Sequence, residues 1–249
     1  MVKNILFVAF SLFLTQSIIG QTYIGAHFNA GLAGAFVKAT APYNSLNQAQ
    51  HDDSLKEGSN TIFAPAFGIH LSKRLKRYDE IYIGLRYQVY GWGSKRFNLQ
   101  FNDSIHRDIG KIQALQTPGD VQYRYRFYNI SIPIYYMKSL RFNEMPMGMS
   151  LALYGGGAIN LLLSQKATAE TIGFTAFGKQ NFDLPTDIYD MLPVNLSLQG
   201  GLRMRQDLGD DIFFTAMPGF GLIPIPSRNE SQRQFQYRLQ VNLGISKAF

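Results

Sequence analysis

Residues 234–249, QFQYRLQVNLGISKAF, alternate apolar and polar side chains up to the last residue of the chain. The apolar set is Phe235, Tyr237, Leu239, Val241, Leu243, Ile245 and Phe249, and it alternates with Gln236, Arg238, Gln240, Asn242 and Ser246. A period of two indicates a β-strand whose two faces meet different surroundings. Strands of soluble sandwiches usually run about 5–6 residues. This alternation is longer than the roughly 9–11 residues with which a tilted strand crosses a bilayer.

The same period recurs along the rest of the chain. It is clean in 22–36, 79–93 and 192–205, and compatible with a strand in 61–74, 121–138, 149–164 and 211–223. Within 121–138 the apolar positions change parity near Phe127 and Tyr128, which predicts a β-bulge. The sequence therefore predicts eight strands.

The connections between these strands alternate in length. The long or moderate ones are 37–60, 94–120, 165–191 and 224–233, and the shorter ones are 75–78, 139–148 and 206–210. Only helices and closed barrels satisfy every backbone group in lipid. We therefore expect an all-β fold: an eight-stranded antiparallel transmembrane β-barrel of the outer-membrane type, with short periplasmic turns and long extracellular loops.

The first 20 residues differ from the rest of the chain. Lys3 is followed by an uncharged apolar run from Ile5 to Leu14, and Gly20 precedes Gln21. This order is typical of a secretory signal peptide, which is removed rather than folded. We expect two parts, a cleaved signal at 1–20 and the barrel at 21–249, and integral placement in a Gram-negative outer membrane.

The amino-acid composition excludes several classes of protein. The chain has 249 residues, of which 46% are hydrophobic and 16% charged. The charged share lies below the roughly 25% of soluble domains, and the apolar content excludes disorder. There is no Cys, which excludes disulfides and thiolate metal sites. The net charge of +7 does not imply nucleic acid, because the chain is predicted to be exported and shows no base-stacking module.

Three stretches resemble a known family. Tyr128 to Tyr136 contains an Ile-Pro core, Tyr154 to Asn160 is glycine-rich, and the last strand ends in Phe249. Together they resemble the outer-membrane β-barrel domain family widespread in Bacteroidota, the PorT-like or "porin family" small barrels. The resemblance implies a barrel over the whole mature chain. It implies no particular activity, because the family is functionally mixed.

The resemblance also gives a role to the C-terminal strand. Bacterial outer-membrane barrels typically end in an aromatic residue with apolar residues at alternate positions before it, and the barrel assembly machinery reads that signal. The matching residues are Phe249, Ile245, Leu243 and Val241. Lys247 departs from the pattern, although its aliphatic stem could reach the membrane interface.

Basic residues occupy two predicted places. The lumen basic cluster consists of Arg86, Arg203, Arg205 and Arg238, on the polar faces of strands. Burying such charges without partners is costly, so we expect loop carboxylates, Tyr faces, water or a bound anion beside them. The periplasmic basic turn consists of Lys73, Arg74, Lys76 and Arg77, and we expect anionic phospholipid head groups as its partners.

Two groups of residues that contain histidine are candidates for a catalytic or a metal site. His70 and Ser72 have the spacing of lipid A deacylases, but Lys73 stands where those enzymes have Asn, and both face the predicted lumen. His51 with Asp52 and Asp53 could hold a hard cation, although a solvated loop explains them better. We predict no catalytic residue, no cofactor and no metal.

These features favour a non-catalytic outer-membrane barrel that acts as a structural or interaction subunit of an envelope complex through its extracellular loops. Its expected partners are outer-membrane lipids, the barrel assembly machinery and an envelope protein bound by the loops. The alternatives are a small porin or gated channel and, as a third class, a lipid-modifying enzyme. An eight-stranded lumen is just wide enough for side chains to fill, so the bulky inward residues are expected to block diffusion.

Overall fold

The computed structural model describes residues 21–39, 60–75, 79–94, 97–99, 119–140, 148–172, 180–184, 191–224 and 232–249. The predicted signal segment 1–20 lies outside these ranges. The elements are β1 (Thr22–Ala39), β2 (Ile62–Phe63), β3 (Ala66–Arg74), β4 (Glu80–Gly93), β5 (Phe97–Leu99), β6 (Gly119–Leu140), β7 (Met149–Ile172), β8 (Gln180–Leu184), β9 (Val194–Gly209), β10 (Ile212–Ile223) and β11 (Gln232–Ala248). Over the described residues, no helix is long and apolar enough to cross a membrane.

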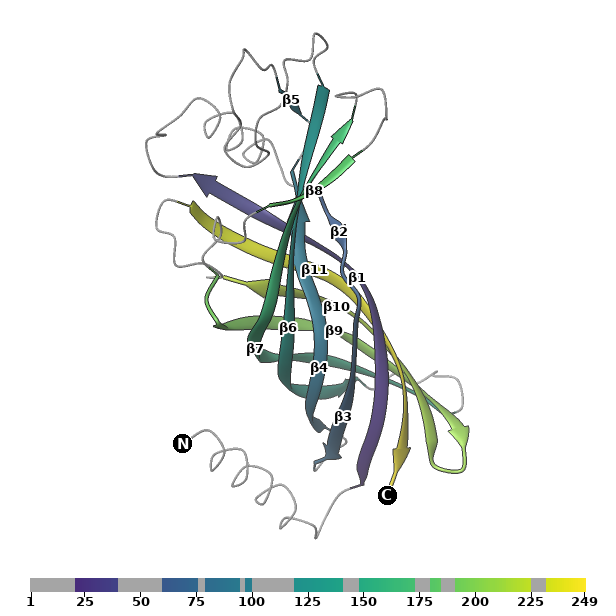
Figure 1. The fold of residues 1–249 in the computed structure, drawn as a ribbon. Helices are drawn as coiled ribbons and strands as arrows, with labels where there is room; N and C mark the ends of the chain where they lie inside the picture. Colours follow the sequence, from purple (N-terminus) through teal and green to yellow (C-terminus); the bar gives the residue numbers. More distant parts are fainter. Residues whose placement is uncertain are drawn as a thin grey trace.

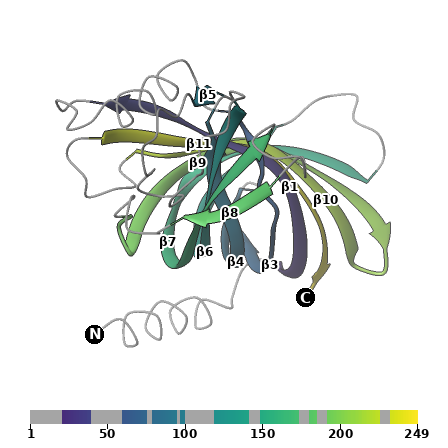
Figure 2. The same cartoon turned by 45° about the horizontal axis from the view of Figure 1, so that its top comes forward.

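The eight long strands form one closed antiparallel barrel. They pair in the order β6-β4-β3-β1-β11-β10-β9-β7, and pairing between β6 and β7 closes the circle (Figures 1 and 2). The seam joins the first strand to the last, from Tyr23 opposite Ala248 to Ala39 opposite Gln232. The predicted fold class is confirmed.

The strand registers fix the tilt of the barrel. One row of paired residues runs from Asn195 around all eight strands and returns to β9 at Arg205, ten residues further along. Its members in order are Asn195, Asn160, Ser131, Arg86, Gly68, His27, Gly244, Thr215 and Arg205. This stagger inclines the strands by about 40° to the barrel axis.

Alternate side chains point to opposite sides of the wall. Leu196 and Leu198 are 64% and 63% exposed, whereas Ser197 and Gln199 between them are 1% and 5% exposed. Polar residues thus line the lumen and apolar residues cover the outside, which is the distribution expected for a barrel surrounded by lipid.

The outer face of β6 shows the height of the apolar band. Exposed Arg126 and Lys138 delimit it, and Tyr128, Ile130, Ile132, Ile134 and Tyr136 point outward between them. Twelve residues at about 3.3 Å each, on a strand tilted by about 40°, span about 30 Å along the barrel axis. This height matches the hydrocarbon core of a bilayer, about 30 Å.

The bulge lies at the predicted level but in the neighbouring strand. The register shifts between Tyr128 and Asn129, which pair with Ser164 and Leu162, so the extra residue is Leu163 of β7. In β6 the inward side remains constant from Tyr123 to Met137. The apolar parity changes there because the inward residues turn from polar to aromatic, and not because the strand turns over.

Some predicted boundaries are wrong. The connection 206–210 is shorter than predicted, because β9 continues to Gly209 and β10 begins at Ile212. The stretch 61–74 is divided into β2 and β3 around Pro65, which has no N–H to donate to a ladder. The long connection 165–191 begins too early, because β7 continues to Ile172 and β8 pairs with it. Most of 37–60 and 94–120 lies outside the described residues.

Strands β6 and β7 continue beyond the other strands. Pairing of β6 with β4 ends at Arg124, and pairing of β7 with β9 ends at Leu161. Beyond these points β5 pairs with β6 and β8 pairs with β7. The four strands form an extension, which we call the projecting sheet, at the end of the barrel opposite the C-terminus (Figure 1). We call that end the loop end and the other the terminal end.

Candidate functional site in the barrel lumen

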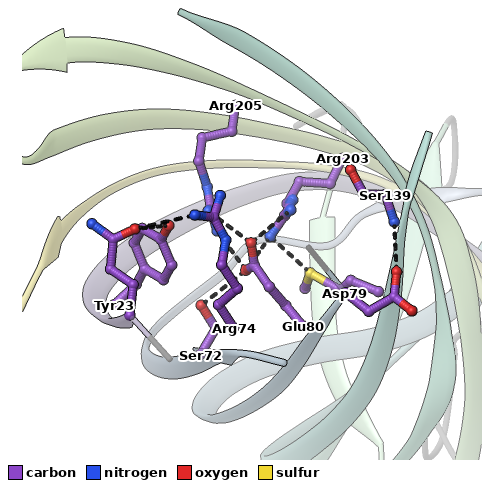
Figure 3. A network of polar contacts seen from close by, with 10 residues as sticks. Tyr23, Ser72, Arg74, Asp79, Glu80, Ser139, Arg203 and Arg205 are labelled. Carbon is purple, nitrogen blue, oxygen red and sulfur yellow. Dashed lines mark hydrogen bonds and ion pairs between the residues drawn. The ribbon is translucent and has the colours of Figure 1, made fainter. Parts of the chain in front are cut away.

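An ion cluster crosses the lumen near the terminal end. Glu80, the first residue of β4, accepts hydrogen bonds from Arg203 and Arg205 of β9 (Figure 3). The nitrogen–oxygen distances are 2.5 and 3.1 Å for Arg203 and 2.8 and 2.7 Å for Arg205. All three side chains are buried. Each guanidinium therefore binds the carboxylate through two nitrogens, the geometry that makes such pairs strong and directional.

Neighbouring strands complete this cluster. The Ser72 hydroxyl lies 3.4 Å from the same carboxylate, and Arg203 also contacts the Met137 sulfur. The Arg205 guanidinium stacks 4.0 Å from the Tyr23 ring centroid, a cation–π contact. Tyr23 in turn donates to Gln21, which also accepts from Arg74. Residues from β1, β3, β4, β6 and β9 thus meet near the terminal end of the lumen.

A second layer holds Arg86 and Arg238, which are 1% and 0% exposed. Arg238 donates to Gln88 at 3.1 Å, to Asn29 at 2.9 Å and to the Ala64 carbonyl at 2.7 Å. Among the described residues, Arg86 donates to the Tyr135 hydroxyl, at 2.7 Å. No hydrogen bond or ion pair joins either arginine to a carboxylate of the described residues.

Side-chain amides connect this layer across the lumen. Gln88 donates to Asn160 and Asn160 to Asn195, while Asn29 donates to Gln240. Gln240 and the Tyr135 hydroxyl both donate to the side-chain oxygen of Gln199. The side-chain nitrogen of Gln199 donates to the Ser197 hydroxyl. The interior is thus filled with connected polar side chains, and such networks rigidify a structure when their groups are paired.

Aromatic residues fill the lumen at the loop end. Trp92 lies 5.3 Å from the rings of both Tyr125 and Phe127. The cluster consists of Ala35, Tyr90, Trp92, Tyr123, Tyr125, Phe127, Ala167, Ala169, Met191 and Ile223, all buried. It joins the inner face of the projecting sheet to β1, β4 and β10.

The structure divides the predicted lumen basic cluster. Arg203 and Arg205 share Glu80, whereas Arg86 and Arg238 lie in the amide layer. The expected carboxylate partner is present for the first pair, but it comes from a strand rather than from a loop. A Tyr partner is also present, for Arg86 and for Arg205.

The predicted periplasmic basic turn is only partly described. Lys73 is 9% exposed, so it is not a free head-group ligand on the surface. Arg74 points inward and contacts Gln21 beside the ion cluster. Lys76 and Arg77 lie outside the described residues.

The candidate catalytic residues His70 and Ser72 contact other side chains of the lumen. The His70 ring stacks on Tyr82 with centroids 4.9 Å apart, and Ser72 contacts Glu80. His51, Asp52 and Asp53 lie outside the described ranges. Within those ranges, no three His, Asp or Glu side chains are grouped so that they could hold a metal ion.

The residues predicted as an assembly signal point outward from β11. Val241, Leu243, Ile245 and Phe249 are 42%, 45%, 58% and 72% exposed. Lys247 shares this face, and its ammonium lies 5.9 Å from the Phe249 ring centroid.

Sequence reasoning missed Glu80 as a lumen residue. Glu80 is two residues before Tyr82 and six before Arg86, so the parity of β4 already places its side chain inward. Gln199 and Tyr135 could be found by the same rule, but their partners on distant strands could not.

Comparisons with known proteins identify no family. No protein-family model matches the chain, and no curated protein matches it. Among solved structures, the chain is similar to Neisserial surface protein A at 10% identity, with a TM-score of 0.43, covering 93% of this chain and 100% of that one. The outer membrane protease OmpT from Escherichia coli gives 9% identity, a TM-score of 0.39, and coverage of 94% and 100%. Ail of Yersinia pestis gives 12% identity, a TM-score of 0.29, and coverage of 93% and 100%. The fold assignment above rests on the strand pairing of this chain.

Proposed function

We propose that this protein is an integral outer-membrane barrel without catalytic activity, which acts as a structural or interaction subunit of an envelope complex. The observation that carries this proposal is the projecting sheet. It extends beyond the apolar band, and its inner face packs into the aromatic cluster. The barrel anchors it, and the loop-end surface makes the contacts.

Membrane placement is supported by the outer surface. The apolar band on β6 has the height of a hydrocarbon core, and large apolar side chains cover the outside of every long strand. The terminal end then faces the periplasm, and the projecting sheet lies on the extracellular side. The resemblance to the Bacteroidota barrel family and recognition of Phe249 by the barrel assembly machinery are parts of the same proposal.

The projecting sheet has two unlike faces. Its inner face packs into the aromatic cluster around Trp92, which holds it over the barrel mouth. Its outer face carries Arg124, paired to Glu170, and Lys166, paired to Asp183, and Arg126 lies at its border, where β6 still pairs with β4. A charged, rigidly supported surface above the membrane suits recognition of a protein partner, because binding residues are commonly displayed by a rigid scaffold.

The alternatives receive less support. A porin needs an open path, whereas the described lumen contains an ion cluster, an amide layer and an aromatic layer in succession. A lipid-modifying enzyme needs its nucleophile and base at the lipid face, whereas His70 and Ser72 are bound inside.

Site-specific photo-crosslinking in intact cells tests the proposal. A photoreactive amino acid at Arg126 or Lys166 should give a discrete adduct with an envelope protein. The matched control is Leu196, which points outward from the band and should crosslink to lipid alone. The absence of a protein adduct at both outer-face positions, with the barrel folded, would contradict the interaction role. Conductance of the purified wild-type barrel in planar bilayers would instead favour the channel.

A further inference from the structure

Two pairs of basic residues stand opposite each other across strand ladders at the loop end. Arg126 of β6 is the register partner of Lys166 of β7, and both side chains are exposed. Lys38 of β1 is the register partner of Arg233 of β11. Residues directly opposite in an antiparallel pair have Cβ atoms about 5 Å apart, and like charges in that arrangement destabilise a sheet. Two ladders of this barrel thus carry the same unfavourable pairing.

The two pairs lie at nearly one height, on opposite sides of the barrel. Strands β4 and β3 separate β6 from β1, and β9 and β10 separate β7 from β11. Ser131 and His27 belong to one row of paired residues. Toward the loop end Arg126 follows Ser131 by 131 − 126 = 5 residues, and Lys38 follows His27 by 38 − 27 = 11 residues. The stagger offsets about four residues of this difference, so the heights of Arg126 and Lys38 differ by about 6 Å.

Exposed aromatic residues lie on the membrane side of both pairs. Phe36 and Phe235 are opposite each other, two residues before Lys38 and Arg233, and they are 66% and 50% exposed. Tyr128 points outward two residues from Arg126. Girdles of aromatic residues mark the membrane interfaces of outer-membrane barrels. The basic pairs therefore lie at the level of the lipid headgroups.

The positive charge of the first pair is only partly compensated. Lys166 forms an ion pair with Asp183 at 3.0 Å. Arg126 is exposed, and no hydrogen bond or ion pair joins it to another of the described residues. One positive charge is thus left uncompensated beside the membrane.

The terminal border of the apolar band lacks opposed cations on β6 and β11. The exposed cation of β6 there is Lys138, and its register partner is Leu153. Lys247 of β11 is opposite Ile24 on one side and Ile212 on the other. Opposed cations are therefore a feature of the loop-end border and not of every membrane border of these strands.

We propose that the pairs Arg126–Lys166 and Lys38–Arg233 bind anionic phosphate groups of lipid headgroups in the outer leaflet. A phosphate oxygen accepts hydrogen bonds from both cations of a pair, and arginine matches phosphate geometry especially well. The bound phosphate turns the repulsion within each pair into attraction to a shared anion. This inference rests on the membrane placement proposed above and goes beyond it, because it holds whether or not a protein binds the projecting sheet.

The test uses the whole barrel folded into phosphatidylcholine vesicles with or without phosphatidic acid, whose headgroup is an anionic phosphate. Phosphatidic acid should raise the urea midpoint of the wild type. Arg126→Gln should lower the midpoint when phosphatidic acid is present. In phosphatidylcholine alone it should leave the midpoint unchanged or raise it, because the repulsion with Lys166 is removed. A midpoint lowered equally in both kinds of vesicle would show a purely structural role and overturn the proposal.

Three further measurements complete the test. Arg233→Gln breaks the second pair and should behave like Arg126→Gln, which covers the case in which the first variant does not fold. The matched control Lys138→Gln removes an outward cation of the same strand opposite Leu153. It should show no rise in phosphatidylcholine alone and a smaller loss with phosphatidic acid. Inorganic phosphate added to phosphatidylcholine vesicles should not replace phosphatidic acid.

Two outcomes overturn the proposal. One is an equal effect of phosphatidic acid on the midpoints of the wild type, Arg126→Gln and Arg233→Gln. The other is a rise of the wild-type midpoint with inorganic phosphate alone, which would make the ligand a free anion. A wild-type barrel that inserts into neither kind of vesicle would instead contradict the membrane placement.

Discussion

Glu80 and Arg203 join β4 to β9 across the lumen, although β6 and β7 separate these strands on the shorter path around the wall. The pair therefore adds a direct connection through the interior to the hydrogen-bonded sheet. Arg205 makes the same connection two residues further along β9. The cluster fixes the distance across the barrel at its terminal end.

Glu80→Gln tests the strength of this connection. The substitution leaves two buried guanidinium groups without a carboxylate, and breaking a buried ion pair costs about 3–5 kcal/mol. We expect a loss of this order in the free energy of unfolding, measured by urea titration in vesicles or detergent.

Two further variants serve as controls for the loss of stability in Glu80→Gln. Asp183→Asn removes an exposed ion pair with Lys166, and we expect an effect below about 1 kcal/mol because exposed pairs are weak. Replacement of Glu80, Arg203 and Arg205 together by Met should recover much of the stability lost in Glu80→Gln. A triple variant less stable than Glu80→Gln would show that packing, and not uncompensated charge, dominates.

Gly219→Ala tests packing between β9, β10 and β7. A Cβ on Gly219 would overlap the Tyr154 hydroxyl, whereas one on Gly155 would meet nothing within 4 Å. We expect Gly219→Ala to destabilise the barrel by about 1–3 kcal/mol and Gly155→Ala to leave it nearly unchanged. Adding Tyr154→Phe should recover part of the loss. Equal unfolding midpoints for the two alanine variants would contradict this reading of Tyr154.

Much of this fold follows from period two alone. Alternation located all eight long strands, because lipid outside and a polar lumen inside impose opposite chemistry on neighbouring residues. It placed Leu196 outward and Gln199 inward without any knowledge of the partners. It failed at the loop end of β6, where Tyr123, Tyr125 and Phe127 point inward and Arg124 and Arg126 point outward, and where the extra residue lies in β7. A single strand cannot reveal in which member of a pair a bulge lies.

The lumen site was less accessible to sequence reasoning. Which side chains point inward follows from parity, but which of them meet follows from the ten-residue stagger around the barrel. That stagger brings Arg203 to Glu80 and Arg238 to Gln88. It is set by the pairing of all eight strands together, so no local pattern contains it.

Leu196→Arg tests the outer band. Leu196 is 64% exposed on the outside of β9, and arginine near the bilayer midplane costs about 2–4 kcal/mol. The adjacent Ser197→Arg places the same side chain in the filled lumen and should fail through steric overlap. We expect Leu196→Arg to lose stability in vesicles but much less in detergent, while Ser197→Arg is impaired in both. Identical behaviour of the two variants in both media would mean that the outer surface does not contact lipid.

Deletion of Phe249 tests the seam where the barrel closes. The Phe249 N–H donates to the Thr22 carbonyl at 2.8 Å, and the Thr22 N–H donates to the Phe249 carbonyl at 3.2 Å. The last residue thus ends the ladder between the first and last strands, and its ring is 72% exposed on the outside. Removing it takes away one pair of seam hydrogen bonds and the aromatic end of the outward pattern. We expect export to be unchanged and the amount of folded, heat-modifiable barrel in the outer membrane to fall. Phe235→Ala is the matched control, because it removes an outward aromatic side chain at the other end of β11 and should assemble almost normally. If the Phe249 deletion and Phe235→Ala accumulate to the same level as wild type, the terminal aromatic residue has no special part in assembly.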